Sequence, residues 1–263
     1  MTTVKDVYDI LDKFCPFNTA MDFDNVGILV GKPSEPVKNI LVSLDVTDDI
    51  MREASYVGAN LIITHHPVIF DPIKKIHSTD IVHKLIKNGF NVICAHTNLD
   101  MAKGGVNDAL AEALTLVNTK PLTTYKTGEV TLPMGLVGTL EYTLSSVEFA
   151  NFVKRALNCS GLRFTNLSEK KYISKVGLCS GSGGNLISDA ISAGVDAFVT
   201  GEIKHHEILK AIQHNITVVD VGHFQSENLI VKRVAEVLNG RFNGVKVYMS
   251  NARLDKIAYV SYI

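Results

Sequence analysis

The chain carries no appreciable excess of charge of either sign. Its 26 lysines and arginines balance 27 aspartates and glutamates, and the formal net charge is -1. Proteins that bind nucleic acid or anionic membranes usually concentrate positive charge on one surface. We therefore expect neither partner, and a small polar metabolite fits this composition better than a polymer.

Cysteine is scarce, and long apolar runs are missing. The four cysteines, Cys15, Cys94, Cys159 and Cys179, lie far apart and form no C-x-x-C pair, so we expect reduced, buried thiols. No apolar run approaches the length that spans a bilayer, and the N-terminus shows no basic, apolar and cleavage-site pattern of a signal peptide. The sequence predicts a soluble, cytoplasmic protein.

The chain does contain a regular alternation of short apolar runs and amphipathic segments. Its first half opens with a helix from Thr3 that ends before Pro16. The other elements expected in this half are strands at 39–45, 61–64 and 91–95 and helices at 47–57, 78–87 and 106–116.

The second half repeats the scheme. Helices are expected at 145–157, 205–214 and 225–238, and a further helix after the strand at 175–179 extends through Ile191. The expected strands lie at 175–179, 197–200, 216–221 and 245–249. We infer an α/β fold of two related lobes with mixed sheets and a metal cleft between them. The predicted division is an N-terminal lobe at 1–116, a connector without sustained periodicity at 117–134, and a C-terminal lobe at 135–263 that completes the metal site.

Three polar clusters each follow a predicted strand, where α/β proteins gather their ligands. They are His65-His66-Pro67, His96-Thr97-Asn98-Leu99-Asp100 and Gly222-His223-Phe224-Gln225-Ser226-Glu227. Imidazole and carboxylate groups together suit divalent transition metals, and a pair of such ions can activate water for hydrolysis. The clusters predict a two-metal site.

His65 and His66 are adjacent, so in a regular strand their side chains point to opposite faces. At a strand end, with Pro67 holding His66 extended, each imidazole can reach a different ion. A pair of surface histidines at a strand-to-loop junction explains this motif alone equally well, and only the other clusters favour the metal.

Asp100 follows the strand at 91–95 by a short polar turn, and its carboxylate can bind an ion. A helix N-cap is the alternative, but Gly104-Gly105 separate Asp100 from the helix expected at 106–116. His96 can be a third imidazole ligand or a group that orients a ligand or binds substrate, and we favour the second role.

His223 and Glu227 are four residues apart, which places both on one face of a helix, close enough to share an ion. A glutamate in a first helical turn also complements the helix dipole without any metal. In the company of the other clusters we favour Glu227 as a ligand, with a water or hydroxide of lowered pKa in the open positions as nucleophile.

Two further motifs are weaker. Glu202, in Thr200-Gly201-Glu202, can shuttle protons or bind substrate, or it can simply precede a helix whose His206 and His214 we expect to be solvated together with Glu207 and Lys210. The loop Gly181-Ser182-Gly183-Gly184-Asn185 can cradle an anion or be a plain tight turn, and it matches neither a P-loop nor a dinucleotide fingerprint.

These motifs resemble a known family, the GTP cyclohydrolase I type 2 homologues, also called Nif-three-like proteins. The resemblance covers most of the chain and rests on Asp24-Asn25-Val26-Gly27, Thr64-His65-His66-Pro67, Ala95–Asp100 with Gly104–Asp108, Thr200-Gly201-Glu202 and Gly222-His223-x-x-Ser226-Glu227. It implies a dinuclear site with His65, His66, Asp100, His223 and Glu227 as ligands and Glu227 touching both ions. It also implies a ring-like homohexamer, a trimer of dimers, with metal sites facing an internal cavity.

Two features depart from the family pattern. Phe23 stands where many members have tryptophan, which bears on a substrate-side contact, and 117–134 is too short for the extra domain of longer members.

The clusters predict a metal-dependent hydrolase with two divalent ions per subunit (Zn, Mn, Fe or Ni) and with His96 and Glu202 as candidate catalytic groups. The resemblance adds that the substrate is a nucleotide or a related small metabolite. Opening of the imidazole ring of GTP and phosphoester hydrolysis are rival reactions. The alternative is a metal-containing ring-shaped scaffold with regulatory partners and no turnover.

Overall fold

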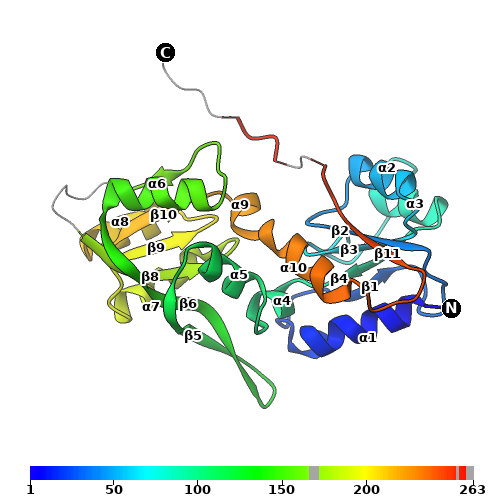
Figure 1. Ribbon diagram of the computed structural model, residues 1–263, viewed down its shortest axis with the longest axis horizontal. Coiled ribbons are helices and arrows are strands. Elements are labelled where there is room, and N and C mark those ends of the chain that lie inside the picture. The colour runs from blue at the N-terminus through cyan, green and yellow to red at the C-terminus, as the bar shows by residue number, and fades with distance from the viewer. Residues whose placement is uncertain (166–171, 253–254, 259–263) are drawn as a thin grey trace. The chain divides into compact units, whose positions relative to one another are not determined.

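The computed structural model describes residues 1–165, 172–252 and 255–258 (Figure 1). These residues form two compact units. The first contains 1–105 and 230–252, and the second contains 106–165, 172–229 and 255–258. The first unit is therefore assembled from two separate parts of the sequence.

The first unit is built on a five-stranded mixed sheet. Its strands are β1 (Gly27–Val30), β2 (Asn39–Ser43), β3 (Leu61–Thr64), β4 (Asn91–Cys94) and β11 (Lys246–Met249). The spatial order is β1-β4-β3-β2-β11, with β1 antiparallel to β4 and all other pairs parallel. Every residue of β3 and β4 is buried, which is usual for central parallel strands covered on both faces.

The helices of this unit begin where the sequence offers caps. They are α1 (Val4–Phe14), the 3-10 turn η1 (Phe17–Thr19), α2 (Asp48–Tyr56), α3 (Ile81–Lys87), α4 (Thr97–Met101) and α10 (Leu229–Leu238). Thr3 forms a capping box with Asp6, and the Thr47 side chain accepts from the Ile50 amide. Apolar side chains of α2, α3 and the sheet form the core, including Leu41, Ile50 and Leu85.

The second unit is built on a six-stranded mixed sheet. Its strands are β5 (Val117–Thr127), β6 (Val130–Ser145), β7 (Arg163–Phe164), β8 (Tyr172–Cys179), β9 (Ala197–Thr200) and β10 (Thr217–Asp220). The spatial order is β5-β6-β8-β9-β10-β7. The pairs β8–β9 and β9–β10 are parallel, and the pairs β5–β6, β6–β8 and β10–β7 are antiparallel.

The helices of this unit pack against the sheet through two clusters of buried apolar side chains. They are α5 (Val106–Ala113), α6 (Ser146–Ala156), the 3-10 turn η2 (Gly183–Leu186), α7 (Ile187–Ser192), α8 (His205–Gln213) and α9 (His223–Glu227). One cluster contains Leu110 and Phe149 from α5 and α6, and the other contains Ile187 and Ala211 from α7 and α8. The predicted α/β fold with mixed sheets is confirmed.

Two expectations are corrected. The segment 117–134, expected to be an irregular connector, instead forms β5 and the first part of β6, a long hairpin (Figure 1). Most of its residues are exposed, so the alternation of apolar and polar residues that indicates a strand is absent.

The strand expected at 245–249 also lies elsewhere than predicted. We expected it in the C-terminal lobe, but β11 pairs with β2 in the sheet of the first unit. Strand pairing between distant residues leaves no local sequence signal, because side-chain periodicity reports burial and not the identity of the neighbouring strand.

Within residues 1–165, 172–252 and 255–258, no helix is long and apolar enough to cross a membrane.

Candidate metal centre

In the first unit, polar residues follow three neighbouring parallel strands. Asp45 comes after β2, His65 and His66 after β3, and His96 after β4. Because parallel strands end at the same edge of a sheet, these side chains gather there. The sequence separations between them are large, and only the strand order β4-β3-β2 brings them together.

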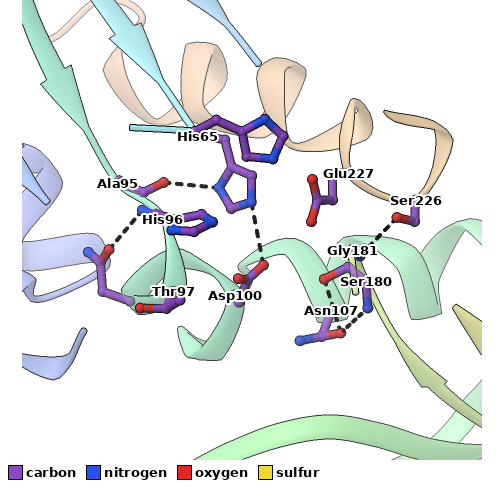
Figure 2. A network of polar contacts seen from close by, with 12 residues as sticks. His65, Ala95, His96, Thr97, Asp100, Asn107, Ser180, Gly181, Ser226 and Glu227 are labelled. Atoms are coloured by element: carbon purple, nitrogen blue, oxygen red, sulfur yellow. Dashed lines mark hydrogen bonds and ion pairs between the residues drawn. The ribbon is translucent and has the colours of Figure 1, made fainter. Parts of the chain in front are cut away.

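His65 is buried and fixed in orientation. Its Nδ1–H donates to the carbonyl oxygen of Ala95 at 3.0 Å (Figure 2). A carbonyl oxygen is only an acceptor, so the proton must be on Nδ1 and the ring lone pair on Nε2. That Nε2 lies 3.6 Å from Asp100 Oδ1, so the ring presents the nitrogen that could bind a metal toward a carboxylate.

His66 and His96 are held in the same way by carboxylates. His66 Nδ1–H donates to Asp45 Oδ1 at 2.7 Å, and His96 Nδ1–H donates to Asp24 Oδ1 at 2.8 Å. A carboxylate on the outer ring nitrogen fixes the tautomer and raises the basicity of the other nitrogen, as in many metal-ligating histidines. His65, His66 and His96 therefore all offer Nε2.

The three imidazoles form one cluster. One ring nitrogen each from His65, His66 and His96 lies within 4.8 Å of the other two, and the ring centroids are 5.1 to 5.8 Å apart. Neutral imidazoles at this spacing suit a divalent transition metal. His96 thus contributes a nitrogen to the cluster, and its predicted role in orienting a ligand or binding substrate stays a prediction.

Asp24 is a strongly stabilised carboxylate. Burial alone would raise its pKa, but hydrogen bonds from His96 and from the Thr97 hydroxyl and amide outweigh burial and lower the pKa to about 2. The group therefore stays ionised at neutral pH, as an acceptor that orients His96 must.

The short polar turn in which we expected Asp100 is a turn of helix. Asp100 belongs to α4, where its amide donates to the His96 carbonyl at 3.0 Å. Its carboxylate is turned toward His65. This position agrees with the prediction that Asp100 does not cap the helix that follows Gly104-Gly105.

In the second unit, His223 stands between two carboxylates. Its Nδ1–H donates to Glu202 Oε1 at 3.0 Å, and its Nε2 lies 3.1 Å from Glu227 Oε2. His223 and Glu227 share one face of α9, as the i,i+4 spacing predicted. However, α9 ends at Glu227 and α10 is a separate helix, whereas we expected one helix over 225–238.

The contact between His223 and Glu227 needs a positive charge. With the proton of His223 on Nδ1, the Nε2 lone pair and the carboxylate oxygen are both acceptors at 3.1 Å. Glu227 is only 3% exposed, and a buried carboxylate is costly without a compensating cation. A second proton on the ring, a proton on the Glu227 carboxyl group or a metal ion supplies that charge, and this donor set fits the ion.

The loop at 181–185 is a tight turn that supports these residues. Its amides are used inside the protein: Gly181 N donates to Ser226 Oγ at 2.9 Å (Figure 2), Gly183 N to Thr200 Oγ1 at 3.1 Å and Gly184 N to Glu202 O at 3.2 Å. The anion-cradle alternative loses these three amides as donors. A Cβ on Gly181 would lie 2.2 Å from Glu227 Oε1, so glycine is required there.

The helix α8 confirms one expectation and corrects another. His206, Lys210 and His214 are exposed as predicted, but Glu207 is buried. Its Oε2 accepts from the Lys204 amide at 2.7 Å. A glutamate at the third position of a helix can turn back to its start, which explains why the prediction of a solvated side chain fails here.

Sequence reasoning missed the residues that orient the histidines. Asp24 and Asp45 were not singled out as functional, although Asp24 belongs to the Asp24-Asn25-Val26-Gly27 motif and Asp45 ends a predicted strand. The position of Asp45 after a strand was the available signal. Pairing it with His66 required knowledge that β2 lies beside β3.

Comparisons with known proteins place the chain. A GTP cyclohydrolase 1 type 2 homolog of Clostridium perfringens is 31% identical, with 98% of this chain and 99% of the relative covered. The one of Clostridium acetobutylicum is 34% identical, with 90% of each covered. The crystal structure of a Bacillus cereus protein related to NIF3 superposes with a TM-score of 0.91 at 25% identity, covering 99% of each chain. The family model for Duf34/NIF3 (NGG1p interacting factor 3) matches residues 2–256, and the chain belongs to that family.

Proposed function

We propose that this protein is a metal-dependent hydrolase that acts on a nucleotide or a related small metabolite. Two divalent ions would be held by five side chains, namely His65, His66, Asp100, His223 and Glu227. Oxygen and imidazole ligands accept Zn, Mn, Fe or Ni. The names of the curated relatives, which refer to GTP cyclohydrolase, favour a nucleotide.

The orientation of the histidines carries this proposal. In each of the four candidates, Nδ1–H donates to an oxygen that can only accept: Ala95 O for His65, Asp45 for His66, Asp24 for His96 and Glu202 for His223. A buried imidazole needs an acceptor for its N–H in any case, but here the same nitrogen, Nδ1, is the donor in all four rings, so Nε2 is the nitrogen that can ligate a metal in each. Four in one chain favour metal ligation.

The protein residues have distinct proposed roles. Two divalent ions, when bound, would lower the pKa of water and stabilise negative charge on the substrate. Asp45, Asp24 and Glu202 keep the imidazoles in the ligating tautomer. The Glu202 side chain is 56% exposed, so it can exchange protons with solvent as well as hold His223.

The test is metal analysis paired with hydrolysis assays. The purified chain is stripped with a chelator, reconstituted with single divalent ions, and assayed with GTP and other nucleotides. We expect about two ions per chain in the wild type and loss of both metal and turnover in Glu227→Ala. Glu236→Ala is the matched control, because Glu236 is an exposed glutamate in an ion pair with Lys232 on α10.

Three outcomes separate the possibilities. Metal bound without turnover of any nucleotide would reject the hydrolase and support the scaffold alternative. A wild type that binds no ion under any condition would overturn the metal centre itself. Equal losses in Glu227→Ala and Glu236→Ala would show a general effect on folding.

A further inference from the structure

Two exposed phenyl rings stand beside the histidine cluster of the first unit. Phe23 is 65% exposed and Phe70 is 47% exposed. Their ring centroids are 6.3 Å apart at an interplanar angle of 57°. The Phe70 ring also meets the His96 ring edge-on, with 6.3 Å between centroids, so the two phenyl rings continue directly from the candidate metal centre.

Polar contacts fix the two loops that carry these rings. The Asn25 side-chain amide donates to the carbonyl oxygen of Ile69 at 2.6 Å, which joins the loop of Phe23 to the loop of Phe70. The Met21 amide donates to Thr97 Oγ1 at 2.9 Å, and the Thr97 amide donates to Asp24 at 3.0 Å. The rings are therefore anchored to the start of α4, next to His96.

An exposed phenylalanine lacks the burial that stabilises its ring in a core. Here the planes of two exposed rings are inclined to each other, so that the rings form a corner. Aromatic rings prefer stacked or edge-to-face partners. A flat ring stacked on one phenyl group would meet the edge of the other. Such a ring would also be close to His96 and His66.

We propose that Phe23 and Phe70 bind the heterocyclic base of the substrate by stacking and so select ligands that carry a flat heterocyclic base over ligands that lack one. The inference rests on the proposed function, since it assigns a substrate class to the same site. It goes further in naming the residues that set specificity. The charged part of the ligand would lie on the side of the imidazole cluster.

The experiment measures binding and does not depend on turnover. Guanosine monophosphate and ribose 5-phosphate are titrated calorimetrically into the full chain reconstituted with metal, and the metal content of every preparation is recorded. Stacking on an aromatic side chain contributes enough that removing it should weaken base binding about 5- to 100-fold. We expect this loss of guanosine monophosphate affinity in Phe23→Ala and Phe70→Ala.

Two controls isolate the base. Ribose 5-phosphate has no ring to stack, so its affinity should change by less than about twofold in both variants. Tyr56→Ala removes an aromatic side chain that is 91% exposed on α2 of the same unit, and it should leave both affinities unchanged.

Several results would overturn the proposal. One is equal weakening of both ligands, and another is no weakening of guanosine monophosphate. A change of oligomeric state in Phe23→Ala or Phe70→Ala without a base-selective loss would show that the rings form a subunit interface. If any of these three results is found in preparations that retain their metal, base stacking is rejected but the proposed hydrolase is not. If the metal is absent throughout, the proposed function fails instead.

A second readout uses the absence of tryptophan from this chain. Phe23→Trp introduces a single indole at the proposed corner. Guanosine monophosphate should quench its fluorescence, and ribose 5-phosphate should not, because only the base can stack on the indole. An emission spectrum that ignores both ligands, or responds to both equally, would contradict base stacking.

Discussion

Each candidate ligand histidine depends on an acceptor that is distant in the sequence. His66 uses Asp45 and His96 uses Asp24. These two carboxylates are not among the predicted metal ligands. They nevertheless decide which nitrogen of each imidazole ring carries the lone pair. At the scale of single residues, the metal centre is therefore larger than its ligands.

Removing such an acceptor should weaken metal binding without abolishing the fold. We expect Asp45→Ala to lower metal affinity roughly 10- to 100-fold, because His66 loses the partner that fixes its tautomer. Competition with a chromogenic chelator measures this change. Asp49→Ala, which removes a surface carboxylate paired with Arg52 on α2, should leave the affinity unaltered, and a similar loss in both variants would contradict the assigned role.

The buried thiols give a prediction about alkaline stability. Burial raises the pKa of Cys159 to about 11 and that of Cys15 to about 12. Well below pH 8.5 these thiols are neutral in both folded and unfolded chains. Above that pH the unfolded chain loses the protons first, so the free energy of unfolding should fall as pH rises toward 11.

Urea denaturation at pH 8.5 and 10.5 tests this effect. The wild type should lose more unfolding free energy over this range than Cys159→Ala, because the variant lacks one of the titrating groups. Tyrosines and lysines titrate equally in both proteins and cancel in the comparison. Parallel losses in the two proteins would show that the Cys159 thiol is not shielded.

At the scale of elements, helix starts follow their caps closely. Ser145 accepts from the Glu148 amide while Glu148 returns to the Ser145 amide, so α6 begins with both halves of a capping box. We expect Ser145→Ala to lower the free energy of unfolding by about 1 kcal/mol. Chemical denaturation should show no comparable change for Ser160→Ala, which alters an exposed serine after the same helix.

The sequence predicted elements well where local signals exist. Strands β3 and β9 occur where continuous apolar runs placed them, and α1 and α6 start at the expected caps. Elements with weak local signals were missed. β1 is only partly buried and β7 has two residues, while the exposed hairpin of β5 and β6 owes its form to pairing between strands.

The same distinction applies to the candidate site. His65, His66, Asp100, His223 and Glu227 were recognisable because residue type and strand-end position are local properties. Their ligand roles stay predictions. The parts that sequence reasoning missed, Asp24 and Asp45, depend on which strand lies beside which, and that is a property of the whole sheet.

At the scale of the whole molecule, the first unit needs the end of the sequence. β11 supplies an edge strand to its sheet, and Glu53 of α2 accepts hydrogen bonds from Ser250 and from the Asn251 amide just after β11. We therefore expect a fragment of residues 1–116 to lack a cooperative thermal transition, because the β2 edge and the surface beneath α10 are left uncovered.

A chain of residues 1–105 joined by a Gly-Ser linker to 229–252 is the matched comparison. It restores α10 and β11 to the unit and should melt cooperatively in a circular dichroism experiment. Cooperative melting of the 1–116 fragment at the temperature of the joined chain would show that the last helix and strand contribute nothing to the first sheet.

The split of the first unit also governs the timing of events on the ribosome. The described part of the second unit is mostly one continuous stretch, 106–229, whereas the sheet of the first unit gains its last parallel strand only when β11 emerges. Domains fold as units during synthesis. Residues 1–105 are thus translated before the second unit but complete their sheet after it, because the edge of β2 stays open until β11 emerges.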